Sequence, residues 1–188
     1  MRIIDSLENH KELLTLLVAT AGGAFALWRW MVDQKWRRVQ HAQSLIEKFH
    51  EKENTIKVFE ILDTVGDVDF ESDNNSKKKV TINVTDKFLI GALSTFDQKD
   101  ENEDDELIVR GILDGFFEDL SAFQSHIEAG LIKVQDVQPY LEYWMGELTG
   151  QGRVRTAAFA KQVAMFLKYF GYKRVLTLGT NMGYSFPT

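Results

Sequence analysis

The strongest constraint on this chain is one uncharged apolar run near its beginning, LLTLLVATAGGAFALW, from Leu13 to Trp28. Extended to Val32, the run covers roughly 20 residues, which at about 1.5 Å per residue span the ~30 Å hydrocarbon core of a bilayer. The sequence therefore predicts a transmembrane helix over residues 13–32, preceded by an N-terminal flank, residues 1–12. The sequence contains no second run of this kind.

The residues that follow the run indicate where the helix leaves the bilayer. Tryptophan rings favour the headgroup region because their bodies are apolar while their N–H groups are polar. We interpret six residues as the membrane interface: Trp28, Arg29, Trp30, Trp36, Arg37 and Arg38. Lysine and arginine outnumber acidic residues only on this side of the run, which favours a cytoplasmic location for the residues beyond it. We expect a single-pass protein of the cell inner membrane.

Two other interpretations of the run stay open. The triplet Ala19-Thr20-Ala21 has the small-x-small pattern of a signal-peptidase site, although the acidic flank before the run and the cationic residues after it disfavour a cleaved signal peptide. A buried core helix of a soluble protein is the second alternative, because Gly22 and Gly23 lower the hydrophobicity of the run.

Small residues recur at four-residue spacing within the run, which places them on neighbouring positions of one helix face. They are Thr15, Ala19, Gly22, Gly23 and Ala26. A face of this kind lets a second helix approach closely, so it predicts helix–helix contact in the membrane and a homo-oligomer. The alternative is that small residues are simply common in transmembrane helices.

The rest of the chain is long enough for one domain with a core. The chain has 188 residues, which leaves about 155 after the run, a usual domain size. Hydrophobic residues at 44% and charged residues at 27% fit a globular domain, and the absence of cysteine excludes disulfides and thiolate metal sites. We predict an all-α fold in which the transmembrane helix continues into a cytoplasmic helical bundle, residues 33–171, followed by a C-terminal tail, residues 172–188.

Hydrophobic spacing predicts the helices of this domain. They are the continuation of the transmembrane helix to about residue 54, then 55–65, 85–96, 106–129, 136–150 and 159–170. The helix at 106–129 has the widest apolar face and is expected at the centre. The polar stretch 66–79 predicts a surface loop, followed by a short extended piece at 80–84. Glycine and asparagine in the tail favour a strand or an extended strap over a helix.

The charge of the chain limits its partners. A net charge of −6 argues against general nucleic-acid binding, which needs a basic surface. Seven of the ten residues from Asp97 to Glu106 are acidic, and their mutual repulsion predicts a solvated loop. This segment does not fit a calcium loop, because Asp105 stands where the sharp turn needs glycine.

Catalytic and metal-binding patterns are absent from the sequence. Glu47 and His50 have the spacing of a carboxylate-bridged di-iron motif, but such a site needs a second copy that the sequence lacks. Arg37 and His41 are separated by three residues, fewer than the arginine–histidine motif of HEPN nucleases requires. Serine-hydrolase, phosphate-loop and dinucleotide-binding motifs do not occur. We therefore predict no catalytic residues, no cofactor and no metal ion.

The stretch from Ile112 to Trp144 consists of a long helix, a Gly-Leu-Ile turn, an acidic cap and a helix that carries Tyr-Trp. With the segment WRRVQHAQSLIEKF, it resembles a family of uncharacterised bacterial proteins that have one N-terminal membrane helix and a cytoplasmic helical domain. The resemblance implies a domain of unknown function, found among membrane proteins and proteins associated with phage defence, with no catalytic residues to transfer. The layout is also similar to a pore-forming membrane accessory protein of RNA-targeting CRISPR systems, but the arginine–histidine pair is missing.

These observations favour a protein that acts by contact rather than by catalysis. We expect a membrane-anchored interaction or scaffolding module whose partners are the lipid bilayer, further copies of the chain and an unidentified protein. An oligomeric pore or membrane-perturbing effector is the alternative, since Thr15, Thr20 and the Gly22-Gly23 pair could also face water. An enzyme with an unrecognised site is the lesser alternative.

Overall fold

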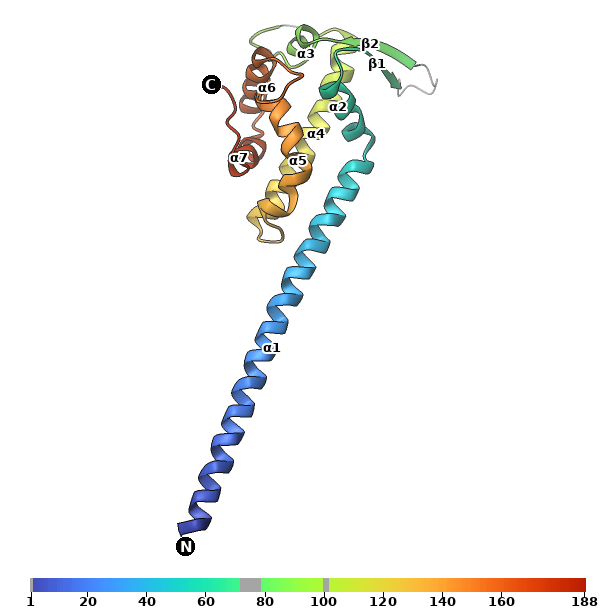
Figure 1. Cartoon of the computed structure of the whole chain (residues 1–188). Helices are drawn as coiled ribbons and strands as arrows, with labels where there is room; N and C mark the ends of the chain where they lie inside the picture. Colours follow the sequence, from blue (N-terminus) through green and yellow to red (C-terminus); the bar gives the residue numbers. More distant parts are fainter. Residues whose placement is uncertain (1, 72–78, 100–101) are drawn as a thin grey trace. The chain divides into compact units, whose positions relative to one another are not determined.

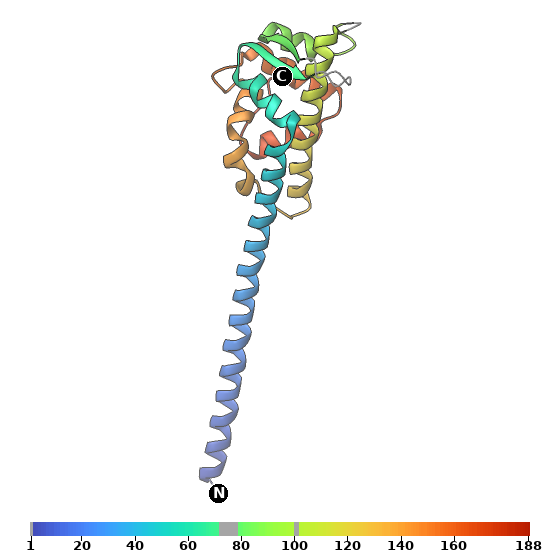
Figure 2. The same cartoon turned by 90° about the vertical axis from the view of Figure 1, so that its right-hand side faces the viewer.

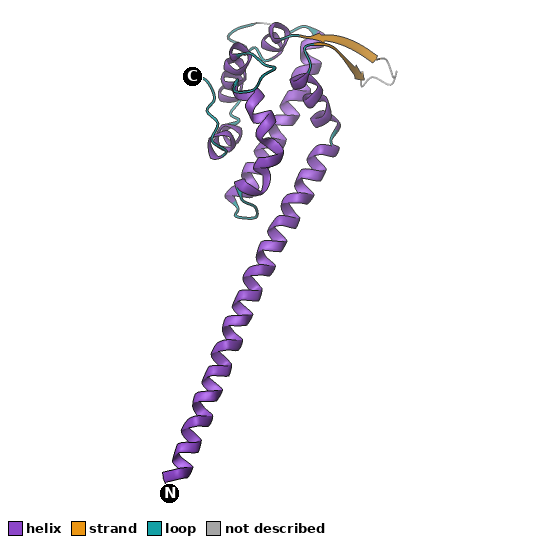
Figure 3. Ribbon diagram, viewed as in Figure 1, coloured by secondary structure: helices purple, strands orange, loops and turns teal. Residues whose placement is uncertain are grey.

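The computed structural model describes residues 2–71, 79–99 and 102–188, which form seven helices and two strands (Figures 1 and 3). Contacts within the chain divide it into two compact units, Met1–His41 and Ala42–Thr188. We describe each unit by itself.

The first unit is the beginning of α1, a single helix that extends over Arg2–Glu51. The expected continuation of the apolar helix beyond residue 32 is confirmed, because the helix has no break before Glu51. Neither glycine of the Gly22-Gly23 pair interrupts it. The side chains of the predicted flank, and those of Leu13 and Leu14, lie outside the described residues.

The second unit contains the end of α1 and all other elements. These are α2 (Glu53–Asp63), β1 (Gly66–Glu71), β2 (Lys79–Val84), α3 (Asp86–Ala92), α4 (Asp104–Glu128), α5 (Val134–Thr149), α6 (Ala157–Tyr169) and α7 (Lys173–Asn181). Helix α4 packs against α2, α3 and α7, while α5 packs against α6 (Figures 1 and 2). The prediction that the helix near 106–129 lies at the centre is confirmed.

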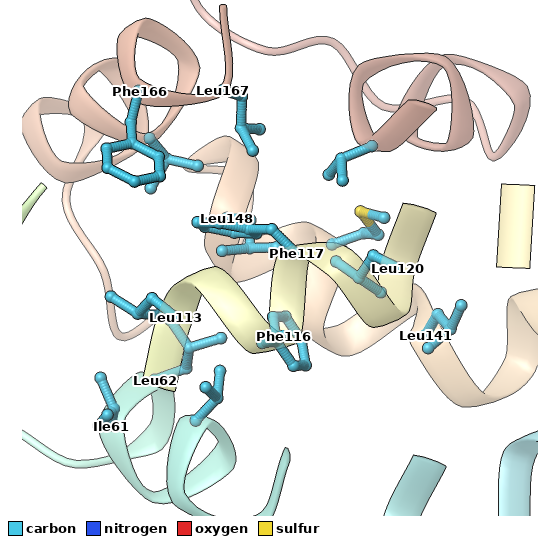
Figure 4. Packing of buried hydrophobic residues seen from close by; sticks show 14 of the residues in the cluster. Ile61, Leu62, Leu113, Phe116, Phe117, Leu120, Leu141, Leu148, Phe166 and Leu167 are labelled. Atoms are coloured by element: carbon cyan, nitrogen blue, oxygen red, sulfur yellow. The ribbon is translucent and has the colours of Figure 1, made fainter. Parts of the chain in front are cut away.

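Phenylalanine side chains of α4 form the middle of the core (Figure 4). Phe116 and Phe117 are fully buried. The Phe116 ring lies 5.6 Å from that of Phe49, in the last turns of α1, and the Phe117 ring lies 5.9 Å from that of Phe166 in α6. Aromatic contacts of α4 therefore connect the end of α1, at the start of the second unit, with α6, near its C-terminal end. Leu113 and Leu120, which share this face of α4, are also buried.

The chain is mostly helical as predicted, and β2 confirms the extended piece expected at residues 80–84, but β1 lies where a loop was predicted, so the fold is not purely α. The two strands form an antiparallel hairpin in which Val68 pairs with Ile82 and Phe70 with Val80. Residues 72–78 lie outside the described part of the chain. Val68 and Phe70 are buried, whereas the intervening Asp69 is exposed and accepts a hydrogen bond from the Thr81 hydroxyl at 2.7 Å. The alternating acids made the strand resemble a polar loop in the sequence.

The C-terminal tail is also corrected, because residues 173–181 form helix α7 rather than a strand or strap. Val175 and Leu178 of α7 are buried, so the tail belongs to the domain core. Gly179, which suggested a turn, faces Phe186 so closely that a Cβ at position 179 would overlap its ring. This glycine permits a close contact instead of ending a helix.

The predicted acidic loop is shorter than expected. Its last three residues, 104–106, already form the first turn of α4. Glu106 is 7% exposed rather than solvated, and its carboxylate receives the Lys99 ammonium group and the backbone N–H of Glu103. This pairing offsets the repulsion on which the prediction relied. Asp100 and Glu101 lie outside the described residues.

A buried carboxylate organises the connection between α5 and α6. Helix α5 ends at Gly150, whose φ of 74° is the left-handed conformation that glycine tolerates best. Glu147 is 1% exposed, and its carboxylate accepts backbone N–H groups of Arg153 at 2.9 Å, Val154 at 3.1 Å and Arg155 at 2.9 Å. Three donors satisfy the buried charge and fix the path of the loop.

The loop between α5 and α6 places the guanidinium group of Arg155 in the interior of the domain. This group is buried, pairs with Asp86 at 2.8 Å, and donates to the carbonyl oxygens of Ile61 and Thr64. Those carbonyls belong to the last turn of α2, where a helix lacks internal donors. The carboxylate of Asp86 also accepts the backbone N–H of Thr156 at 2.8 Å. The side chains of Arg155 and Asp86 thus join the end of α2, the start of α3 and the start of α6.

We predict that this network makes stability depend on pH. Burial raises the pKa of Asp86, but hydrogen bonds from Thr156 and Arg155 outweigh burial and leave it below its usual value of 3.8. The contribution of Asp86 is therefore present above the unfolded-state pKa and is lost as the pH falls through the lower folded-state pKa. Asp86→Asn should lower the unfolding free energy at pH 7 and reduce its loss upon acidification below about pH 4. Urea titrations across this pH range measure both, and parallel curves for the two proteins would contradict the assignment.

We also predict that Phe116→Ala destabilises the second unit by about 3–5 kcal/mol, because the change leaves a cavity among packed rings. Leu120→Ala should cost about 2–5 kcal/mol for the same reason. Leu131, which is 50% exposed, supplies the control, and Leu131→Ala should change stability by less than about 0.5 kcal/mol. Urea denaturation followed by circular dichroism distinguishes the three variants. Equal stability of the Phe116 and Leu131 variants would place the core elsewhere.

Candidate functional site

The first candidate site is the apolar part of α1. Within the described residues, α1 is the one helix that is long and apolar enough to cross a membrane, and its most apolar stretch is 0% buried. Leu16 and Leu17 are each 65% exposed, and Val18 is 71% exposed. These side chains have no apolar partner that removes them from water. Length and composition alone fit a membrane span, without showing that a membrane is present.

The six predicted interface residues lie along the middle of the same helix. Trp28, Trp30 and Trp36 are 56%, 58% and 63% exposed, so all three rings are available to a solvent or a lipid. Arg29 and Arg37 are exposed, whereas Arg38 is half-buried. Trp36 lies eight positions after Trp28, a rise of about 12 Å, so the three rings extend beyond the depth of one headgroup region, about 5–8 Å.

The predicted helix-contact residues Thr15, Ala19, Gly22, Gly23 and Ala26 are all exposed on unbroken helix. The Cβ positions of Gly22 and Gly23 have nothing within 4 Å, so no contact inside this chain requires glycine there. The hydroxyl of nearby Thr20 donates to the carbonyl of Leu16 at 2.7 Å, which satisfies its polar group within the helix. Contact between two such helices stays a prediction.

His50, which has the di-iron spacing with Glu47, and His126 of α4 lie in different surroundings. The ring of His50 is 5.6 Å from that of Phe59 and nearly perpendicular to it, which is an aromatic contact. His126 lines an open apolar cavity of about 160 Å³ together with Phe49 and Phe123. Among the described residues, no group of three or more histidine, cysteine, aspartate or glutamate side chains could hold a metal ion.

A second candidate site, which the sequence did not reveal, is an exposed group of side chains at one end of α4 and α6. We call it the aromatic platform and define it by Phe96, Leu107, Arg110, Tyr169 and Phe170. Phe96 is 65% exposed, and its ring lies 5.9 Å from that of Phe170 and 6.3 Å from that of Tyr169. Phe96, Leu107 and Arg110 also line a cavity of about 230 Å³.

Arg110 holds the aromatic platform together. Its guanidinium carbon lies 4.8 Å from the ring centre of Phe170, 5.6 Å from that of Phe96 and 5.2 Å from that of the buried Phe166. Such cation–π contacts contribute about 0.5–2 kcal/mol each. The guanidinium also donates to the carbonyl oxygen of Ser94 at 3.2 Å. These contacts fix the positions of the rings and of the guanidinium group at a surface that faces solvent.

A polar pair lies one turn further along α4. Burial raises the pKa of Asp114, despite the opposing effect of a hydrogen bond from the Tyr172 hydroxyl at 3.0 Å and of the nearby Arg110 charge. Burial and the adjacent carboxylate raise the pKa of Tyr172 as well. The hydrogen bond between them joins α4 to Tyr172, the residue before α7.

Sequence reasoning missed the aromatic platform because its members come from three separate segments. Phe96 was expected at the end of a helix over 85–96, and Phe170 on the buried face of the last helix. Instead α3 ends at Ala92, and Phe170, the residue that follows α6, is 36% exposed. A usable signal was present in the sequence: large aromatic residues stand at the ends of two helices, where the apolar stripe no longer requires them.

No protein-family model, curated protein or solved structure matches the chain significantly. The two candidate sites therefore rest on the residues and geometry of this chain alone.

Proposed function

We propose that the protein is a single-pass membrane protein whose helical domain acts by binding other proteins. The observation that carries the first part is the apolar stretch of α1, whose large side chains are exposed. Leu16, Leu17, Val18, Phe25 and Leu27 are between 59% and 71% exposed. Transferring side chains of this size from water to an apolar phase gains about 1.5–3 kcal/mol each, so together they favour a bilayer by on the order of 10 kcal/mol.

The orientation that we propose places the second unit in the cytoplasm. Arg29 and Arg37 are exposed beside three tryptophans, on the side of the apolar run where positive charge exceeds negative charge. Lysine and arginine near a membrane span are retained on the cytoplasmic side. In a bacterium this corresponds to the inner membrane.

Self-association completes the proposal. Nothing lies within 4 Å of the Cβ positions of Gly22 and Gly23, Ala19 is exposed beside them, and close approach of a second backbone would give the two glycines a role. A closed helix pair accounts for this face without a water-filled lumen, because the hydroxyl of Thr20 is already bonded to Leu16. A pore remains an outcome that conductance measurements on the oligomer would detect.

We predict that the chain stays in the membrane pellet after alkaline carbonate extraction, and that a reporter active only in the periplasm is silent when fused after Thr188. Leu17→Arg combined with Val18→Arg should release the chain, because each charge at the centre of a span costs about 2.5–3.5 kcal/mol. Replacing the exposed Lys161 and Lys168 by arginine is the control, and it should leave extraction unchanged. A wild-type chain in the soluble fraction would overturn the anchor, and an active periplasmic reporter would reverse the orientation.

Gly23→Leu should shift the protein in mild detergent from an oligomer toward the monomer, because a leucine side chain holds partner backbones apart. Leu17→Ile is a suitable control, since it changes shape but not size at an exposed position on the side of α1 away from the predicted face. Mass photometry and chemical cross-linking measure the change. An oligomer that survives Gly23→Leu would move the interface to the second unit, and a monomeric wild type would exclude self-association and the pore together.

A further inference from the structure

We propose that the aromatic platform binds a basic amphipathic segment of a partner protein. The apolar side chains of the segment would lie on Phe96, Leu107 and Phe170, and its arginine or lysine side chains would face the acidic residues around them. The inference rests on the proposed function and extends it by naming the chemistry of the partner.

Large apolar side chains are exposed together at the aromatic platform. Phe96 is 65% exposed, Leu107 52% and Tyr169 44%, although the same domain buries Phe116 and Phe117 completely. Phe96 and Leu107 line a common cavity, and Phe96 contacts Tyr169, so these side chains form one surface. Contiguous apolar patches with a polar rim mark protein contacts, and aromatic residues dominate their binding energy.

The aromatic platform is organised before a partner arrives. Three rings surround the guanidinium of Arg110, which is fixed in turn by the carbonyl of Ser94. Side chains that are already ordered lose less conformational entropy when they bind, which leaves more of the contact energy for affinity. These rings already contact one cation of the chain itself, and the rings of Phe96 and Phe170, which are 65% and 36% exposed, are available to a second cation.

The described rim of the platform is acidic. Glu103 and Asp104 are exposed and lie one helical turn before Leu107, so they share its side of α4. Asp97 is exposed and adjoins Phe96 in the sequence. Among the described residues, two cations lie at this end of α4: Lys99 is paired with Glu106, and Arg110 lies among the rings of Phe96, Phe166 and Phe170. The exposed carboxylates of Asp97, Glu103 and Asp104 outnumber these cations.

This charge selects the class of partner. Carboxylates beside exposed ring faces attract arginine and lysine and repel phosphate groups, so the surface favours a basic protein segment over nucleic acid. A helix with apolar residues at three- and four-residue spacing would present one face to the rings and its cations to the rim.

The test uses the full-length chain in nanodiscs of uncharged phosphatidylcholine. The probe is a synthetic helical peptide with leucine on one face, arginine on the other and a benzophenone cross-linker, and empty nanodiscs provide the blank. We expect cross-links, mapped by mass spectrometry, within residues 94–110 and 165–170. Raising the salt concentration from about 0.05 M to about 0.5 M should weaken binding, because the rim charges are exposed to solvent.

Two kinds of variant test the aromatic platform without disturbing the core. Phe96→Ala with Leu107→Ser should weaken peptide binding at least about tenfold, as expected for the loss of an aromatic anchor. Asp97→Asn with Asp104→Asn should weaken binding and flatten its salt dependence. The matched control is Tyr140→Ala with Leu131→Ser, which changes one aromatic and one leucine that are 45% and 50% exposed elsewhere. It should bind the peptide like the wild type.

Equal binding by the Phe96 and control variants would overturn the inference, as would cross-links that map outside the platform. Equally tight binding of a peptide in which glutamate replaces every arginine would also overturn it. Cross-links between two copies of the chain at the platform would make the occupant a second copy instead. None of these results alters carbonate extraction, so failure of this inference is distinguishable from failure of the proposed membrane anchor.

Discussion

The arrangement of the second unit depends on one buried cation, the guanidinium of Arg155. It is buried and donates to the carbonyl oxygens of Ile61 and Thr64 at the end of α2 and to the carboxylate of Asp86 at the start of α3. Removing one partner from a buried charge pair generally costs about 3–5 kcal/mol, because the other charge remains unpaired. The carboxylate of Glu147 fixes the backbone of the loop that contains Arg155. The buried negative charge therefore positions the loop, and the buried positive charge of Arg155 joins the loop to α2 and α3. These contacts fix the positions of α2, α3 and the start of α6, between which the aromatic rings of the core pack.

The sequence predicted the helices that bury a regular apolar stripe. Leu113, Phe116 and Leu120 follow helical spacing, and their burial places α4 at the centre as expected. Strand β1 was missed, although the extended piece at 80–84 was predicted, because Asp67 and Asp69 alternate with the buried Val68 and Phe70, and acids in a short segment resemble a loop. Helix α7 was missed because packing against the core outweighed local turn signals, a case in which tertiary contacts override propensity.

The candidate sites differ in the same way. The apolar run of α1 is a local property, so it can be recognised in the sequence, and in the structure it lies on one exposed helix. The aromatic platform depends on contacts between residues 96, 110 and 170 in the folded chain. The local sequence around each of these residues does not predict those contacts. Arg110 illustrates the difficulty, since in the sequence it is an ordinary charged residue of an amphipathic helix. Its role emerges only from the three rings around it.

The distribution of tryptophan gives the protein two separate optical reporters. Of its four tryptophans, three lie within residues 28–36 and only Trp144 belongs to the second unit. The Trp144 ring stacks parallel on that of Phe59 at 3.9 Å, which places the indole at the contact between α5 and α2. Its fluorescence therefore reports whether these helices are packed, while the emission wavelength of the other three reports whether water or lipid surrounds them. A chain that retains only one of the two groups would reveal either event without interference from the other.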